Sequence, residues 1–158
     1  MLGRSRKLLT KGRDGRWALH LGADERQLLG ALARELGTMI DAAPDDPSLR
    51  RLRPTAYVDD EEREAGWQIL MGEELRTTRR AQLEVVRSTV ERTDLDEDEV
   101  QAWMQALNAL RLVLGTRLDV SEDDDGPVGP DDPNATAFAL YDFLGYLLEG
   151  TVHSLNTA

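Results

Sequence analysis

Three polar side chains interrupt a strongly apolar run late in the chain. Asn108, Arg111 and Arg117 stand among leucine, alanine and valine residues in a stretch too apolar for a surface helix. A buried amide needs hydrogen-bond partners, and a buried guanidinium needs a carboxylate. Asp59 and Asp60 can supply the carboxylates, so we predict that these five residues form a structural polar network. A small-molecule or enzymatic site within the helical bundle, built from the same residues, is the alternative.

Two acidic runs raise the question of a metal site. The first, residues 59–62, opens a predicted helix, where consecutive side chains point about 100° apart and cannot converge on one ion. Carboxylates at this position cap unpaired amides and complement the helix dipole. The second run, residues 122–125, does not fit EF-hand spacing and precedes two Gly-Pro pairs, which indicates a solvating linker. We expect neither run to bind a metal.

Other sequence signs of catalysis are missing. The chain has no glycine-rich phosphate loop, nucleophile elbow, His-Glu-x-x-His motif or cysteine/histidine cluster. The absence of cysteine excludes disulfides, thiolate metal sites and thiol redox chemistry. His20 alternates with Leu19 and Leu21 on a predicted strand, and we expect it at the surface. We therefore predict no catalytic residue, no cofactor and no enzymatic activity.

The pattern along the chain predicts a mainly α fold. Residues 1–22 hold two alternating segments around an Asp-Gly turn, which is typical of a β-hairpin. Residues 23–118 form a helical core with apolar residues every three or four positions and a kink or break near Gly72. Residues 119–133 are an acidic flexible loop, and residues 134–158 form the last helix. We expect a single domain, a helical bundle of about four to five helices preceded by the small hairpin.

Two helices of this bundle have distinctive apolar patterns. The helix around Asn108 is apolar nearly all round, which predicts a central position and a buried Asn108. The chain is also rich in leucine, which is compatible with a homodimer formed through the first or the last helix. The last helix is predicted to bury a stripe of six side chains at helical spacing, namely Phe138, Tyr141, Leu144, Leu148, Val152 and Leu155.

A long connection between the first two helices carries a cluster of cations. Residues 44–58 contain three prolines, which prevent a regular helix. Arg50, Arg51, Arg53 and Tyr57 lie in this connection. Connections of this length are uncommon without a role, and loops of this kind more often carry function than packing. We therefore predict that these four residues bind a protein partner.

The charge of the chain is unevenly distributed. The net charge is −11, with about +5 on the first twenty residues and about −16 on the remainder. An acidic body repels phosphate backbones, which disfavours general nucleic-acid binding and leaves direct DNA contact through a local basic patch open. The sequence has no membrane span and no apolar segment behind its N-terminus, so we expect a cytoplasmic protein.

Two stretches resemble the signatures of an actinomycete domain-of-unknown-function family. They are residues 46–60 (DPSLRRLRPTAYVDD) and 107–118 (LNALRLVLGTRL), and the similarity extends over nearly the whole chain. The family includes an oxidative-stress transcriptional regulator, so the resemblance implies a stress-related role with RNA polymerase or a sigma factor as partner. That kind of regulator senses oxidant through paired cysteines, which this chain lacks. The resemblance thus implies a non-enzymatic regulatory interaction protein without cysteine redox sensing.

Overall fold

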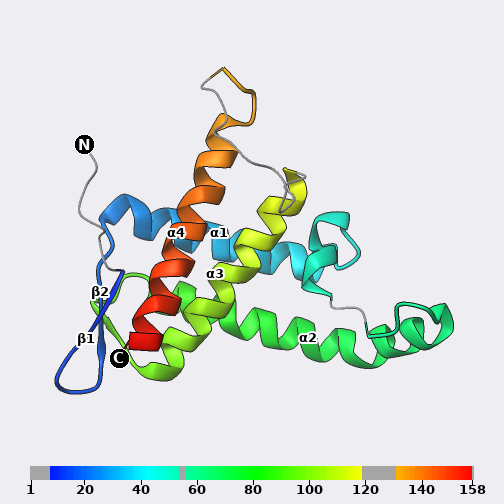
Figure 1. Ribbon diagram of the computed structural model, residues 1–158, viewed down its shortest axis with the longest axis horizontal. Coiled ribbons are helices and arrows are strands. Elements are labelled where there is room, and N and C mark those ends of the chain that lie inside the picture. The colour runs from blue at the N-terminus through cyan, green and yellow to red at the C-terminus, as the bar shows by residue number, and fades with distance from the viewer. Residues whose placement is uncertain (1–7, 54–55, 119–130, 158) are drawn as a thin grey trace.

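The computed structural model of the chain describes residues 8–53, 56–118 and 131–157. These residues form five helices and a small antiparallel sheet (Figure 1), which confirms the predicted fold class. In chain order the elements are β1 (Leu9–Lys11), β2 (Trp17–Leu19), α1 (Ala23–Ala42), η1 (Pro47–Leu52), α2 (Glu61–Thr89), β3 (Asp94–Leu95), α3 (Glu97–Arg117) and α4 (Ala135–Thr157). Most of the predicted acidic loop, residues 119–130, lies outside the described residues.

The predicted hairpin is present and carries a third strand. β1 pairs with β2 around a turn in which Gly15 has a φ of 80°, a conformation that favours glycine. β2 also pairs with the two-residue strand β3, a strand that was not predicted from the sequence. Arg16 reinforces the pairing, since its Nε lies 2.7 Å from Asp94 Oδ2. Asp96 then caps α3 by accepting a hydrogen bond from the Glu99 backbone N at 2.8 Å.

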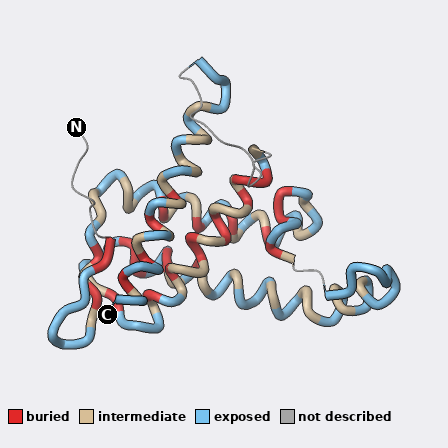
Figure 2. The backbone as a smooth tube through the Cα atoms, viewed as in Figure 1, coloured by how far each residue is buried: buried red, intermediate tan, exposed pale blue. Residues whose placement is uncertain are grey.

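Helix α2 runs without interruption from Glu61 to Thr89, so of the predicted kink or break near Gly72 the break is wrong. A glycine costs roughly 1 kcal/mol in a helix, which is too little to break one that is capped at one end and packed at the other. Asp60 provides the cap by accepting a hydrogen bond from Arg63 N at 3.1 Å. Packing acts only on the C-terminal part, because none of residues 61–82 is buried. We call residues 61–80 the α2 arm; none of them is buried (Figure 2). The first turns of the arm extend beyond the other helices, and its last turns face η1 and the end of α1.

Helix α3 lies at the centre of the fold, as its apolar composition predicted. It packs against α2, α4 and η1, and most of its apolar side chains are buried. Trp103 is one of these, and its indole Nε1 donates a hydrogen bond to Thr89 Oγ1 on α2 at 2.8 Å. Asn108, however, is only half-buried, so its amide does not require the network of partners that the sequence analysis assigned to it.

The buried face of α4 differs from the predicted stripe. Of the six predicted side chains only Leu144 is buried, and Val152 is exposed. The face that packs against α3 and β1 instead includes Thr151 and Ser154. Their hydroxyls bond to backbone carbonyls, Thr151 to its own helix and Ser154 to Leu9 O of β1 at 3.3 Å. Small polar residues satisfied in this way can be buried at little cost, and a search for apolar spacing misses them.

Candidate functional site

The structure does not bring the five residues of the predicted polar network together. Asp60 caps α2 and pairs with Arg63, and Asp59 is exposed. Arg111 lies over the ring of Tyr141 on α4, 4.9 Å from its centroid, so an aromatic face takes the place of the expected carboxylate. Arg117 is exposed, and Asn108 is half-buried. Within the described ranges neither Arg111 nor Arg117 forms an ion pair with a carboxylate.

The 3₁₀ helix η1 places the predicted partner-binding arginines on different sides, because it has three residues per turn. Side chains three positions apart lie on the same side of such a helix. The two leucines of η1 are both buried, and Arg50 and Arg53 share a second side. Arg51 belongs to a third side, where its Nη1 lies 3.5 Å from the position of a Cβ placed on Gly115 of α3. The arginines therefore do not form one continuous patch.

Asp46 fixes the start of η1. Its carboxylate accepts hydrogen bonds from the Ser48 backbone N at 2.8 Å and from the Ser48 hydroxyl at 2.5 Å. These bonds, the hydroxyl first, lower the pKa of Asp46, and the nearby positive charge of Arg117 acts in the same direction. The capping aspartate therefore holds the segment that carries Arg50 and Arg53.

Tyr57 is held separately, at the beginning of the α2 arm. Its backbone N and that of Ala56 both donate to Glu64 Oε1, at 3.0 and 2.7 Å. The bond from Tyr57 is the main reason that the pKa of Glu64 is lowered. The Tyr57 ring is 41% exposed, with the Arg63 guanidinium 5.9 Å from its centroid. Tyr57 is thus accessible, but it does not line the groove described next.

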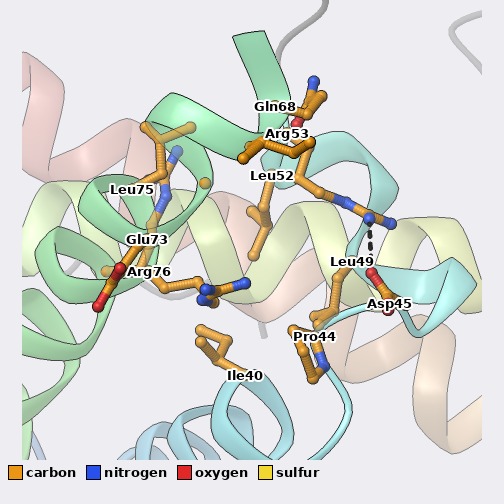
Figure 3. Close-up of a pocket in the computed structure, with 13 residues that line it drawn as sticks. Ile40, Pro44, Asp45, Leu49, Leu52, Arg53, Gln68, Glu73, Leu75 and Arg76 are labelled. Carbon is orange, nitrogen blue, oxygen red and sulfur yellow. Dashed lines mark ion pairs between the residues drawn. The ribbon is translucent and has the colours of Figure 1, made fainter. Parts of the chain in front are cut away.

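A groove of about 400 Å³ separates the α2 arm from η1 and from the end of α1 (Figure 3). We call it the η1–α2 groove. Its apolar lining comes from all three elements and includes Ile40, Leu49, Leu52, Ile69 and Leu75. Three arginines also line it, namely Arg53 at the C-terminal cap of η1 and Arg76 and Arg79 of the arm.

The groove carries a small positive net charge although the chain as a whole is acidic, because its three arginines outnumber Asp45 and Glu73 in the lining. Arg53 lies 3.6 Å from Asp45 Oδ1, a contact with a carboxylate that is fully exposed to solvent. Arg76 and Arg79 form no ion pair or hydrogen bond with any described residue. Arg79 is half-buried, and this burial lowers the pKa of its guanidinium. A desolvated arginine without a carboxylate beside it is suited to an incoming anionic group.

Of the predicted partner-binding residues, only Arg53 lines this groove. Arg76 and Arg79 were not predicted as site residues, because the glutamates that precede them suggest surface ion pairs. The pattern that could have identified Arg79 is the continuation of the buried stripe of α2: Leu75 and Arg79 precede Leu83 and Val86 at helical spacing. A cation on a stripe that is otherwise apolar indicates a surface left open for a ligand or partner.

The described residues show no arrangement typical of a metal or membrane protein. They contain no group of three or more histidine, aspartate or glutamate side chains that could hold a metal ion. No helix in the described ranges is long and apolar enough to cross a membrane. His20 is exposed, and its Nε2 lies 2.9 Å from Thr10 Oγ1 on the neighbouring strand.

Comparison with known proteins identifies the family. The model of a domain of unknown function, DUF2017, matches residues 6–155. The chain belongs to the DUF2017 family. Its curated relatives include the "oxidative stress regulator AosR" of Mycobacterium tuberculosis (strain H37Rv), 32% identical over 128 residues, or 67% of this chain and 56% of the relative. The "putative oxidative stress regulator AosR" of Mycobacterium leprae is 29% identical over 129 residues, or 71% of this chain and 59% of the relative.

These findings confirm the resemblance seen in the sequence. The DUF2017 chain spans less than two thirds of the length of these curated relatives. No solved structure matches it. The names of the relatives describe regulators of the oxidative stress response, and this chain has no cysteine.

Proposed function

We propose that this DUF2017 chain is a non-enzymatic regulatory interaction protein that binds a transcription component through the η1–α2 groove. The observation that supports this most strongly is the groove itself, an apolar depression lined by three arginines in a chain of net charge −11. The names of the relatives, oxidative stress regulators, support a regulatory role. RNA polymerase or a sigma factor is the proposed partner.

The groove indicates the chemistry of the segment that it accepts. Its apolar lining favours aliphatic or aromatic side chains, which gain free energy when they leave water. Arg53, Arg76 and Arg79 favour carboxylates placed beside those side chains. An amphipathic helix or extended segment with one apolar face and flanking acidic residues meets both requirements. Arg50 shares a side of η1 with Arg53 and extends the positive surface outside the groove.

A small anionic ligand is the second candidate for the same groove. Its volume of about 400 Å³ is within the range of small-molecule pockets, and the half-buried Arg79 offers a charged anchor. Thermal unfolding in the presence of a panel of carboxylates and phosphates tests this candidate. A ligand that raises the Tm of the wild type and not of the Arg79→Met variant would favour it.

Affinity capture tests the protein-docking proposal. The tagged wild type, the double variant Arg50→Glu/Arg53→Glu and the control Arg87→Glu are incubated with a nuclease-treated lysate of the native host, and the retained proteins are identified by mass spectrometry. Arg87 is a suitable control because it is an exposed arginine on α2 that pairs with Glu84 outside the groove.

We expect the wild type and the control to retain RNA polymerase or a sigma factor, and the double variant to lose it. Nuclease treatment ensures that a retained transcription protein is not held through DNA. Retention of the same partner by the double variant, with unchanged circular dichroism, would exclude the groove as the docking surface. Loss of the partner by the control as well would mean that net charge, and not the groove, determines binding.

A further inference from the structure

The α2 arm exposes an apolar surface beside the groove. Ile69 is 82% exposed and Leu70 is 79% exposed, in a segment of helix where no residue is buried. Single exposed apolar side chains are ordinary on protein surfaces, but two adjacent ones on a projecting helix form a contiguous apolar surface. The arm extends away from the helical body, so a second molecule can approach it without meeting α3 or α4 (Figure 1).

The two halves of the arm differ in net charge. Residues 61–70 hold three glutamates, including Glu61 and Glu62, and one arginine, a net charge of −2. Residues 71–80 hold three arginines, including Arg76 and Arg79, and two glutamates, a net charge of +1. None of these four side chains forms an ion pair or hydrogen bond with another described residue. Two copies of such a helix attract each other when they run antiparallel, since the acidic end of each then lies beside the basic end of the other.

The sequence of the arm also defines a register for this pairing. An antiparallel alignment centred on Ile69 places Glu62 of each copy opposite Arg76 of the other. Glu62, Gly66, Ile69, Glu73 and Arg76 follow one another at spacings of four, three, four and three residues, so they lie along one stripe of the helix. Gly66 lacks a side chain, and a Cβ added there would meet no atom within 4 Å, which leaves room for a second helix.

We propose that two copies of this chain form a homodimer in which their α2 arms pair antiparallel, with Ile69 at the centre and Glu62–Arg76 ion pairs on either side. The occupant of this face is therefore a second copy of the chain. The pairing places each arm at the mouth of the η1–α2 groove of the other copy, because Ile69 and Arg76 also line that groove. Dimer formation then competes with partner binding; this competition rests on the proposed function, whereas the dimer itself does not.

Charge exchange tests the dimer, with sedimentation velocity as the measurement. The proteins are the wild type, Glu62→Arg, Arg76→Glu, an equimolar mixture of these two variants, Ile69→Asp, and the control Arg87→Glu. Each single charge variant places like charges opposite each other twice, and we expect its dimer Kd to rise about tenfold or more. The mixture restores both opposite-charge contacts, so we expect a heterodimer with wild-type affinity. Circular dichroism confirms that each variant is folded.

The outcomes separate this inference from the proposed function. We expect a wild-type dimer, a monomer for Ile69→Asp, recovery in the mixture and a dimer for Arg87→Glu. A monomeric wild type, a dimer that survives Ile69→Asp, or a mixture that does not recover would each overturn the inference. Affinity capture of a transcription partner reads out the proposed function independently, and a monomeric wild type that still captures the partner would refute only the dimer.

Discussion

Replacement of Arg79 by methionine is expected to make the protein more stable and less able to bind its partner. Arg79 lines the η1–α2 groove half-buried, and burial without a compensating carboxylate lowers the pKa of its guanidinium. The side chain nevertheless stays charged at neutral pH. In the isolated protein the desolvated charge is unfavourable, so its removal should increase the free energy of unfolding.

The size of the gain follows from the degree of burial. A fully buried, unpaired charge costs several kcal/mol, but solvent screening of a half-exposed group reduces this to about 1 kcal/mol. Methionine keeps an unbranched apolar stem and so retains most of the packing against the groove. We expect a net gain of about 0.5 kcal/mol, which corresponds to a Tm increase of about 2 °C for a domain of this size.

Two measurements on the same variant complete the test. Urea denaturation gives the free energy of unfolding, and a binding assay with the captured partner gives the Kd, which we expect to rise about tenfold because one charged contact is lost. Arg87→Met is the matched control, since Arg87 is exposed and pairs with Glu84 at 3.1 Å. Its stability should change by less than about 0.5 kcal/mol. Destabilisation of Arg79→Met by more than about 1 kcal/mol would refute the reasoning, because it would mean that Arg79 serves the fold.

Three further predictions concern the fold that supports the groove. Thr89→Val removes the acceptor of the buried Trp103 indole N–H, and we expect a loss of about 1–3 kcal/mol in urea denaturation; a loss below about 0.5 kcal/mol would show that another acceptor takes over. Gly72→Ala adds a methyl group that meets nothing within 4 Å, so it should increase helix content and slow amide exchange in the α2 arm, and a decrease in either would mean that the arm is not helical there. The Arg16 guanidinium lowers the pKa of Asp94 in the folded state. The contribution of Asp94 to stability is therefore fully present above its unfolded pKa of about 4, and it is lost as the pH falls through the lower folded pKa. Stability measured from about pH 6 to pH 3 should therefore fall more steeply for the wild type than for Asp94→Asn, and parallel curves would contradict the assignment.

Much of the fold could be predicted from local patterns. The Asp-Gly turn, the acidic cap of α2 and the apolar spacing of α3 act over a few residues, and each was recognised correctly. The continuity of α2 could not be predicted in this way, because it depends on packing of its C-terminal half that outweighs two glycines near its start. The buried face of α4 was missed for a related reason: the partners of Thr151 and Ser154 are backbone carbonyls, one of them far away in the chain.

The site was predicted only in part, since it depends on three segments that meet in space. Arg53 was identified from its place in a proline-bounded connection. Arg76 and Arg79 have nearby glutamates in the sequence, which suggested surface ion pairs. The structure directs these two arginines into the groove beside η1, and that placement depends on how α2 crosses α1. The expected bond of Arg111 to a carboxylate was replaced by the face of Tyr141, a contact that no local pattern indicates.

The affinity of the purified chain for purified RNA polymerase and sigma factor tests the central claim most directly. Biolayer interferometry with the wild type, Arg53→Glu and Arg87→Glu measures whether the η1–α2 groove determines binding. We predict measurable binding by the wild type and the control, and a Kd at least tenfold weaker for Arg53→Glu, as expected when an arginine contact is reversed in charge. Equal affinities of Arg53→Glu and the wild type, or no binding by the wild type to either partner, would contradict the account.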